Sequence, residues 1–312
     1  MGRSKKYGRK VHGVLVLNKP KGLSSNQALQ NAKRLFFANK AGHTGSLDPL
    51  ATGVLPLCFG EATKFSQFLL DADKRYLATI RLGEATSTAD SEGETISSQD
   101  ASQITEEAIA KALHPFRGKI QQVPPMVSAL KHNGQPLYKL ARQGIDIPRE
   151  SRSVNIYELK LLEFREGPLA EVDIEVYCSK GTYIRSIASD LGEDLGVGGH
   201  IIRLHRTQAG AYTEAQAISL EDLAQERGEN SPEVLDQQLL GVDSAVLTLP
   251  AIELDEDGGH YFRQGQAIMD LEVYRLGDQG DTVRVYQKNG AFLGLGEITD
   301  DGRVAPKKVV VM

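Results

Sequence analysis

The chain has 312 residues, of which 40% are apolar and 25% are charged, and its formal net charge is −5. This composition is typical of a globular protein, and the length suits one large domain and a small one. No run of about 18 apolar residues exists, which excludes a membrane-spanning helix, and no signal-peptide core follows the basic first ten residues. Cys58 and Cys178 lie far apart in apolar segments, which predicts reduced, buried thiols and a cytoplasmic protein.

The N-terminal part of the chain predicts a strand, a helix and a second strand. Residues 14–17 are apolar and typical of a short strand. Residues 26–37 carry apolar side chains at helical spacing, and either Ser24 or Ser25 can cap this helix. Residues 54–59 form a further apolar strand.

The middle of the chain contains both strand and helix patterns. Apolar and polar residues alternate with the period of a strand in residues 76–82 and 170–178. Between them, residues 86–100 are polar and acidic, which predicts a surface loop without regular structure. Helical spacing indicates three further helices, at residues 105–113, 136–142 and 183–195.

Strands and helices follow one another without a regular βαβ alternation, which favours an α+β fold with a mixed, largely antiparallel sheet. Residues 214–249 are acidic and helical, and the chain then turns to short strands at residues 282–287, 291–297 and 308–311. We therefore expect a large domain over residues 1–249, beginning with a basic tail at residues 1–10. A small β domain is expected over residues 250–312.

Charge is unevenly distributed along the chain. The first 47 residues contain ten Lys or Arg and no Asp or Glu, whereas residues 214–280 contain fifteen acidic residues and three basic ones. The negative net charge therefore hides a basic N-terminal segment of the kind that binds a polyanion such as nucleic acid. A solubilising tail is the alternative interpretation of residues 1–10 taken alone.

Asp48 is the first carboxylate of the chain and follows this basic segment directly. Apolar Leu47 and Leu50 flank it, so desolvation should raise its pKa, and Pro49 favours an extended backbone at Asp48. A carboxylate that acts as a nucleophile or base at neutral pH then needs a nearby cation. The alternative is an ordinary Asp-Pro turn on the surface.

Two other residues are candidates for the same site. Arg185 lies near the start of a predicted helix and has no carboxylate at helical spacing, so its partner must come from elsewhere, unless it is simply solvated. Tyr76 follows Lys74 and Arg75, and an aromatic ring beside cations suits a base and its phosphate, although core packing would also explain a strand Tyr. No phosphate loop, dinucleotide fingerprint or metal-ligand spacing is present, so we expect no cofactor and no metal.

Five strings resemble the bacterial tRNA pseudouridine synthase B family. They are residues 13–22, 42–64, 74–76, 124–131 and 178–186. The resemblance implies a pseudouridine-synthase catalytic domain followed by a PUA-like RNA-binding β-barrel. It implies a catalytic Asp48 paired with Arg185, and Tyr76 stacked on the target base. It also implies substrate or RNA contacts for a set of other residues, namely Lys19, His43, Lys64, Lys131, Tyr183 and Leu204.

The activity implied by the resemblance is isomerisation of a uridine in the tRNA T-arm, by a protein that we expect to be a monomer with tRNA as its partner. A flipped base and a carboxylate suit this chemistry, but the residues do not choose between attack on the sugar, attack on the base and removal of a sugar proton. A noncatalytic RNA-binding or tRNA-folding protein is the alternative hypothesis. A hydrolase with an aspartate nucleophile is disfavoured because the expected metal-ligand pattern is missing.

Overall fold

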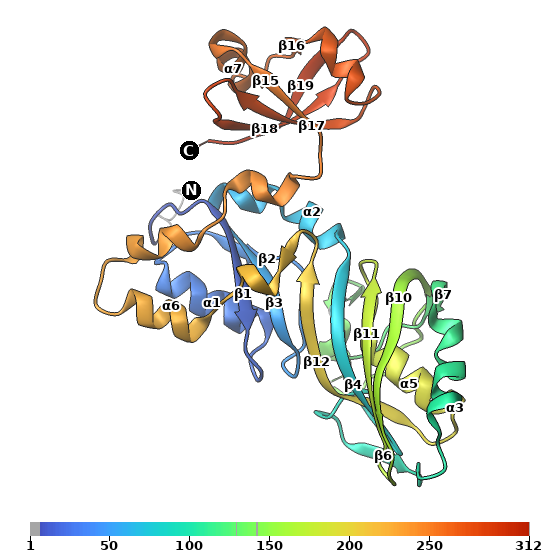
Figure 1. Ribbon diagram of the computed structural model, residues 1–312. Coiled ribbons are helices and arrows are strands. Elements are labelled where there is room, and N and C mark those ends of the chain that lie inside the picture. Colours follow the sequence, from blue (N-terminus) through green and yellow to red (C-terminus); the bar gives the residue numbers. More distant parts are fainter. Residues whose placement is uncertain (1–6, 129, 142, 312) are drawn as a thin grey trace.

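The computed structural model describes residues 7–128, 130–141 and 143–311. It consists of a large mixed sheet with helices and a smaller β unit formed by the C-terminal residues, which stands above the sheet in Figure 1. Within the described residues the main sheet has ten strands, in the order β14-β1-β3-β12-β4-β11-β10-β7, with β13 beside β12 and β2 beside β3. Its strands are β1 (Gly13–Lys19), β2 (Ala41–His43), β3 (Thr52–Phe59), β4 (Lys74–Leu82), β7 (Gly118–Gln122), β10 (Arg152–Arg165), β11 (Glu171–Cys178), β12 (Gly199–Ala209), β13 (Tyr212–Thr213) and β14 (Ile218–Ser219).

The strand pairing confirms the predicted mixed, largely antiparallel sheet. Parallel pairs form between β1 and β14 and between β12 and β3, whereas the other neighbours are antiparallel. The strands predicted at residues 14–17, 54–59, 76–82 and 170–178 correspond to β1, β3, β4 and β11. The long strands β10 and β12 were not predicted.

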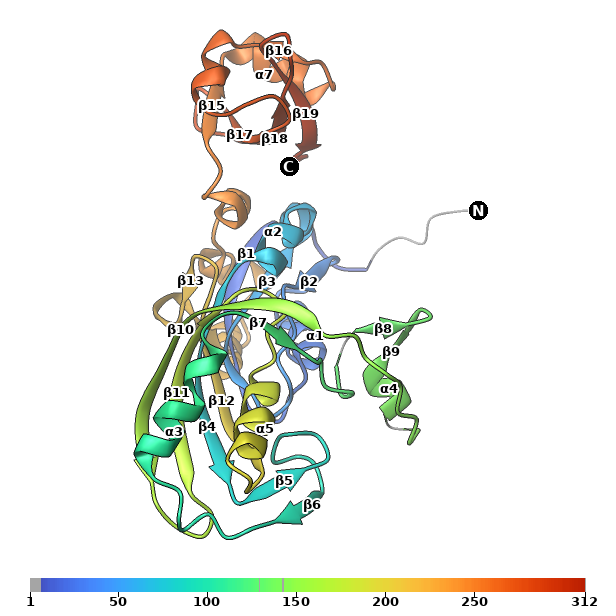
Figure 2. The ribbon, with the colours of Figure 1, turned by 90° about the vertical axis from the view of Figure 1, so that its right-hand side faces the viewer.

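Helices cover one face of this sheet. They are α1 (Ser25–Leu35), α3 (Glu106–Ala112), α5 (Ile184–Asp194) and α6 (Leu220–Arg227), and their apolar side chains share one core with the sheet. Figure 2 shows α3 and α5 against the sheet, whereas the small hairpin of β8 (Lys131–His132) and β9 (Gln135–Pro136) stands apart from it with α4 (Leu137–Ala141). The helix predicted at residues 136–142 is α4, and Arg142 lies outside the described residues. No helix of the described residues is long and apolar enough to cross a membrane.

Local signals explain where the first helix begins. The side chain of Ser24 accepts a hydrogen bond from the backbone of Gln27, and the Gln27 side chain accepts one from the backbone N–H of Ser24. This reciprocal capping satisfies two backbone donors that a helix start leaves without partners. Of the two serines proposed as caps, Ser24 is the cap, and Ser25 is free to contact the loop that carries Asp48.

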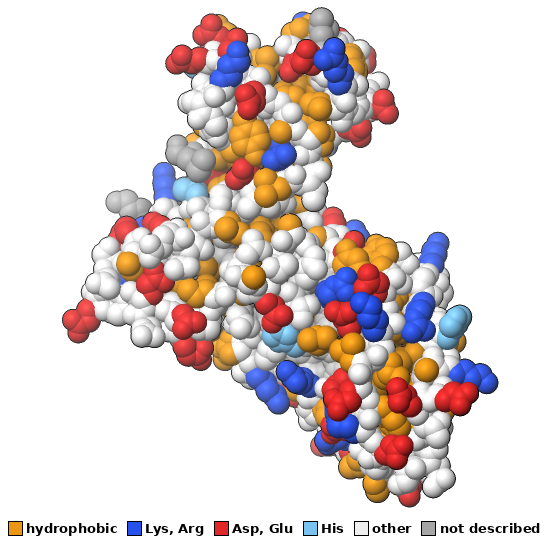
Figure 3. All heavy atoms as spheres, in the orientation of Figure 1, with side chains coloured by type: hydrophobic (Ala, Val, Ile, Leu, Met, Phe, Trp, Pro, Cys, Tyr) orange, Lys and Arg blue, Asp and Glu red, His pale blue; other side chains and the backbone are white. Residues whose placement is uncertain are grey.

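The alternation of β4 separates two very different faces. Lys74, Tyr76, Ala78, Ile80 and Leu82 are buried on the helix side. Of the residues between them, Arg75, Leu77 and Arg81 are half-buried or exposed, and Thr79 is buried. On the outer face, Arg and Lys side chains of β4 and β10 pair with Glu and Asp side chains of β10 and β11. Figure 3 shows these charges interspersed over that face. The outer face therefore carries a network of solvated ion pairs. We look for the active site on the helix side of the sheet.

The prediction of a structureless loop at residues 86–100 was wrong. Strands β5 (Glu84–Thr86) and β6 (Thr95–Ser98) form a hairpin there, and Asp90 makes an isolated β-bridge to Ile201. Its polar side chains bond within the turn, as when the Thr88 hydroxyl donates to the Asp90 carboxylate at 2.6 Å. Polar composition indicated solvent exposure, but Asp90 is only 3% exposed because the turn packs against β12 and α5.

The C-terminal β unit has its own sheet and its own core. Its strands run in the order β15 (Ala251–Leu254), β17 (Thr282–Gln287), β18 (Phe292–Ile298), β19 (Arg303–Val309) and β16 (Ile268–Met269), and α7 (Glu256–Arg263) packs beside them. A second apolar cluster joins this unit to η1 (Gly60–Lys64), α2 (Ser66–Asp71) and η5 (Val242–Val246), with the rings of Phe65 and Phe292 5.6 Å apart. Because this contact is apolar and reinforced by hydrogen bonds, the β unit is held against the main sheet.

A close contact between β3 and β12 sets a constraint on Gly53. Its φ is +100°, and an added Cβ would lie 2.3 Å from the backbone oxygen of Arg206. We expect Gly53→Ala to lower the free energy of unfolding by at least about 2 kcal/mol more than Gly22→Ala, as urea unfolding would measure. Gly22 is the matched control because its φ is +88° but an added Cβ meets no atom within 4 Å. Equal losses in the two variants would show that backbone strain alone, without the clash, determines the effect.

Candidate active site

The loop between β2 and β3 carries Asp48. Its backbone is held from two sides: Leu47 exchanges two hydrogen bonds with the Ser25 hydroxyl, at 2.7 and 3.1 Å, and the Gly22 N–H donates to Pro49 O at 2.8 Å. Leu47 and Leu50 are buried, which anchors the loop in the core. The Asp48 side chain itself remains 37% exposed, so it can meet a substrate.

Arg185, in the first turn of α5, is the cation beside this carboxylate. Its Nε lies 2.9 Å from Asp48 Oδ2, and its Nη1 lies 3.6 Å from Asp90 Oδ2. The guanidinium also donates to Thr88 O at 3.1 Å and Val127 O at 2.7 Å. Arg185 is only 3% exposed, so one buried side chain ties together the Asp48 loop, the β5–β6 turn and the segment after β7.

The electrostatics of Asp48 reflect two opposing causes. Burial raises the pKa of its carboxyl above the ordinary value, and the Arg185 cation opposes this effect. Two smaller influences follow: the charge of Asp90 raises the pKa and that of Lys19 lowers it. The carboxyl is therefore more basic than a solvated Asp, and Arg185 favours its ionised form. A carboxylate of this kind is suited to act as a nucleophile or a base.

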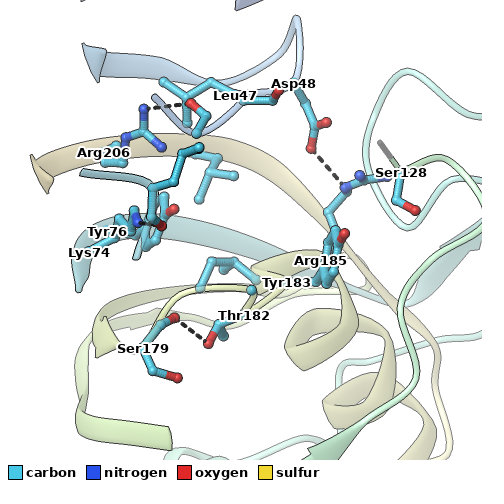
Figure 4. Close-up of a pocket in the computed structure, with 16 residues that line it drawn as sticks. Leu47, Asp48, Lys74, Tyr76, Ser128, Ser179, Thr182, Tyr183, Arg185 and Arg206 are labelled. Atoms are coloured by element: carbon cyan, nitrogen blue, oxygen red, sulfur yellow. Dashed lines mark hydrogen bonds and ion pairs between the residues drawn. The ribbon is translucent and has the colours of Figure 1, made fainter. Parts of the chain in front are cut away.

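A cavity of about 340 Å³ opens beside Asp48. Its walls come from five separate parts of the chain, and they include Tyr76 of β4, Leu204 of β12 and Tyr183 just before α5. Figure 4 shows Asp48 and Arg185 paired at one side of this pocket and Tyr76 at the other. The side chain of Gln122 holds the Tyr183 backbone through two hydrogen bonds, at 2.9 and 3.0 Å, which positions the start of α5.

Two residues beside the pocket, Asp90 and Arg206, were not among the sequence predictions. Asp90 lies beside Arg185, and Arg206 lines the pocket together with Lys74, a cation that the sequence placed beside Tyr76. Arg206 stands two residues from the predicted site residue Leu204, on the same side of β12. Strand periodicity was thus a signal that could have found Arg206. No local pattern could have identified Asp90 as a partner of Arg185.

Two lysines with predicted RNA contacts make contacts within the protein. Lys19 is fully buried and donates to Leu23 O at 2.6 Å, so it supports the chain beneath the Asp48 loop. Burial lowers the pKa of Lys19 to about 8, against the effect of Asp48. Lys64 lies at the contact with the C-terminal unit, where it donates to Val309 O at 2.7 Å. Arg75, expected with Lys74 to hold the phosphate of the base, lies on the outer face and pairs with Glu158 at 2.9 Å.

His43 and Lys131 complete the expected set. His43 ends β2, and its buried Nδ1 finds no hydrogen-bond partner among the described residues. Burial lowers the pKa of His43, and the positive charge of Arg206 adds to that effect, so the imidazole is neutral at pH 7. Lys131 belongs to β8, and its side chain lies outside the described part of the structure.

Family models match the chain in three consecutive segments. A model described as TruB family pseudouridylate synthase (N terminal domain) matches residues 33–184, and one described as tRNA pseudouridylate synthase B C-terminal domain matches residues 185–247. A third, described as Pseudouridine synthase II TruB, C-terminal, matches residues 250–310.

Individual proteins are similar over the whole length. The tRNA pseudouridine synthase B of Saccharophagus degradans is 62% identical over 310 residues, and that of Pseudomonas aeruginosa is 52% identical; each alignment covers 99% of both chains. Among solved structures, a chain in the crystal structure of a Cbf5-Nop10-Gar1 complex is 27% identical with a TM-score of 0.70, covering 96% of this chain and 84% of that one. A chain from an H/ACA RNP bound to a substrate RNA shares the fold, with a TM-score of 0.71 at 23% identity, covering 100% and 92% of the two chains.

Proposed function

Because the chain belongs to the TruB family of pseudouridine synthases, we propose that it isomerises uridine to pseudouridine at position 55 in the T-arm of tRNA. The observation that carries this proposal is the ion pair between Asp48 and Arg185 at the edge of a pocket that also contains Tyr76 and Leu204. The fold class agrees: a pseudouridine-synthase sheet is followed by a small, curled PUA-like β unit.

The target base has to enter the pocket before any bond can break. A uridine inside a folded loop must be flipped out, which costs roughly a few kcal/mol. Stacking on an aromatic face such as Tyr76 returns about 1–3 kcal/mol per base. Tyr76 is 9% exposed, and burial raises the pKa of its phenol, so it remains neutral and presents an uncharged surface to the base.

The chemistry then follows from Asp48. Uracil must be cut from C1′, turned while it is held, and joined again through C5. The ionised carboxylate attacks the sugar or the base, or removes a sugar proton, and Arg185 favours the ionised form in each case. Tyr183 and Leu204 close the pocket around the base and limit the space in which the detached uracil turns.

The test of this function is release of tritium from a T-arm stem-loop labelled at uracil C5, followed by mapping of the product. Release confined to the uridine at position 55 supports the proposal. Tight binding without release would favour a noncatalytic RNA-binding or tRNA-folding protein instead. The buried pair at Asp48 argues against that alternative, because a binding module does not require an Arg buried beside two carboxylates.

Tyr76→Leu tests the role of the aromatic wall. We expect the single-turnover rate to fall at least about 100-fold while RNA affinity changes less than about tenfold, because affinity rests mainly on phosphate contacts outside the pocket. Rapid-quench tritium release and fluorescence anisotropy measure the two quantities. Tyr157→Leu, on the outer face and 47% exposed, is the matched control. Parallel losses of rate and affinity in Tyr76→Leu would mean that this ring mainly binds.

We also propose that the protein acts as a monomer in the cytoplasm. The support is that one chain completes the pocket, and that Cys58 and Cys178 are free, buried thiols, as reducing conditions allow. Light scattering of the free protein and of its complex with tRNA tests the oligomeric state.

A further inference from the structure

Two buried cations lie on the side of the pocket opposite Arg185. Arg206 is 1% exposed and Lys74 is 6% exposed, and both line the cavity. Within the described residues neither forms an ion pair with a carboxylate. Arg206 donates to Val54 O at 2.7 Å and to Gly45 O at 3.2 Å, and Lys74 donates to backbone oxygens that include Leu70 O at 2.8 Å.

Such an arrangement is unfavourable in the absence of an anion. Burial of a charge without a counter-charge is strongly destabilising, and two neighbouring cations repel each other. The effect on Lys74 is visible, since burial and then the Arg206 charge lower its pKa to about 8. Arg185, by contrast, has Asp48 and Asp90 beside it. The described part of the pocket therefore has one cation paired with carboxylates and, across from it, two cations that form no ion pair.

The arrangement around Tyr76 indicates where an anion would sit. Arg206 of β12 lies opposite Tyr76 of β4 in the strand register. Figure 4 shows Arg206, Lys74 and Tyr76 together at one side of the pocket. A flipped nucleotide enters base first, so its phosphates stay near the mouth while the base reaches this wall.

The proposed reaction supplies an anion at this place, and the inference rests on that function. When the C1′–N1 bond breaks, its electron pair stays with uracil, which becomes an anion with charge shared among N1, O2 and O4. When C5 joins C1′, the same electrons form the new bond; C5 loses its proton and N1 gains one, so the base is neutral again. In the routes that begin at the sugar, negative charge on the base therefore exists only between the two steps.

We propose that Arg206 and Lys74 form an anion-stabilising wall that holds the detached uracil between cleavage and rejoining. Fixed cations in a water-poor pocket stabilise a charge that develops during reaction without having to reorganise. They contribute little to binding of the neutral uridine, so their effect appears in the rate. The register that sets Arg206 opposite Tyr76 places this charge beside the ring on which the base would stack.

The experiment compares Arg206→Gln with wild type on two T-arm stem-loops, one with uridine and one with 5-fluorouridine at the target. Fluorine at C5 withdraws electrons and stabilises the uracil anion by itself. We expect Arg206→Gln to lower the single-turnover consumption of uridine at least about 100-fold, and the loss with 5-fluorouridine to be about tenfold smaller. Arg206→Lys, which keeps the charge, should recover part of the uridine rate.

A purely structural role for Arg206 predicts a different result. If the arginine only supports the loop at Gly45, both substrates lose rate by the same factor, and that outcome overturns the inference. Arg203→Gln is the matched control, on the same strand but exposed. Should Arg206→Gln fail to fold, Lys74→Gln carries the same two-substrate comparison with the same criterion. If wild-type protein converts neither substrate, the proposed function itself is refuted.

Discussion

Asp48→Asn is expected to abolish pseudouridine formation, with a rate loss of at least about 10,000-fold, while binding of T-arm RNA is retained. Asn has the shape of Asp, so the loop held by Ser25 and Gly22 should keep its conformation. The amide is neither a nucleophile nor a base, however, and it cannot balance the charge of Arg185. The loss should therefore fall on the chemical step and not on RNA recognition.

Single-turnover tritium release gives the rate, and fluorescence anisotropy with the same stem-loop gives the affinity. Asp257→Asn, an exposed carboxylate of α7, controls for removal of one negative charge from the protein. Asp48 would have no catalytic role if its Asn variant retained activity within about tenfold of wild type.

Arg185→Met is expected to lower the rate by about 1,000-fold at neutral pH and to move the acid limb of the pH–rate profile upward. Burial already raises the pKa of Asp48, and Arg185 is the largest opposing influence. Without the cation the pKa of Asp48 rises further, so a smaller fraction of the carboxyl is ionised at pH 7. Wild-type activity should decline as pH falls through the Asp48 pKa, and the Met variant should decline in the same direction from a higher pH.

The measurement is a series of single-turnover rates between roughly pH 5.5 and 9, where the two profiles should converge partly at high pH. Arg185→Lys is the informative second variant, because it keeps the charge and loses the planar hydrogen bonds to Thr88 O and Val127 O. Its acid limb should stay near that of wild type although its rate is lower. An unchanged acid limb in Arg185→Met would show that the cation does not control ionisation of Asp48.

Thermal unfolding should separate these effects from loss of structure. Removing Arg185 leaves Asp90 buried without its cation. Breaking a buried ion pair in this way lowers the free energy of unfolding by about 3–5 kcal/mol. We therefore expect a lower melting temperature for Arg185→Met than for Arg185→Lys. Rates are compared well below both melting temperatures.

Much of the fold could be predicted because its signals are local. The alternation of β4 and β11, the capping serine of α1 and the helical spacing of α5 each depend on residues within a few positions of one another. The Gly-rich string around Asp48 likewise identified the central residue of the site. At residues 86–100 the polar composition correctly indicated an exposed segment over most of its length. It missed the hairpin of β5 and β6 and the packing of Asp90 against α5 and β12.

By itself the sequence determined the family, several of the strands and helices, and the first candidates for chemistry, Asp48, Tyr76 and Arg185. The tertiary structure alone decided which charges meet. It brought Asp90 to Arg185 and placed Arg206 and Lys74 together in the pocket. It also buried Lys19 beneath the Asp48 loop, and it placed Lys64 at the contact with the C-terminal unit. The physical reason is that periodicity and capping act over a few residues. Desolvation and Coulomb energy instead depend on distances in space. The residues that meet in space can lie far apart in the sequence, as Lys64 and Val309 do.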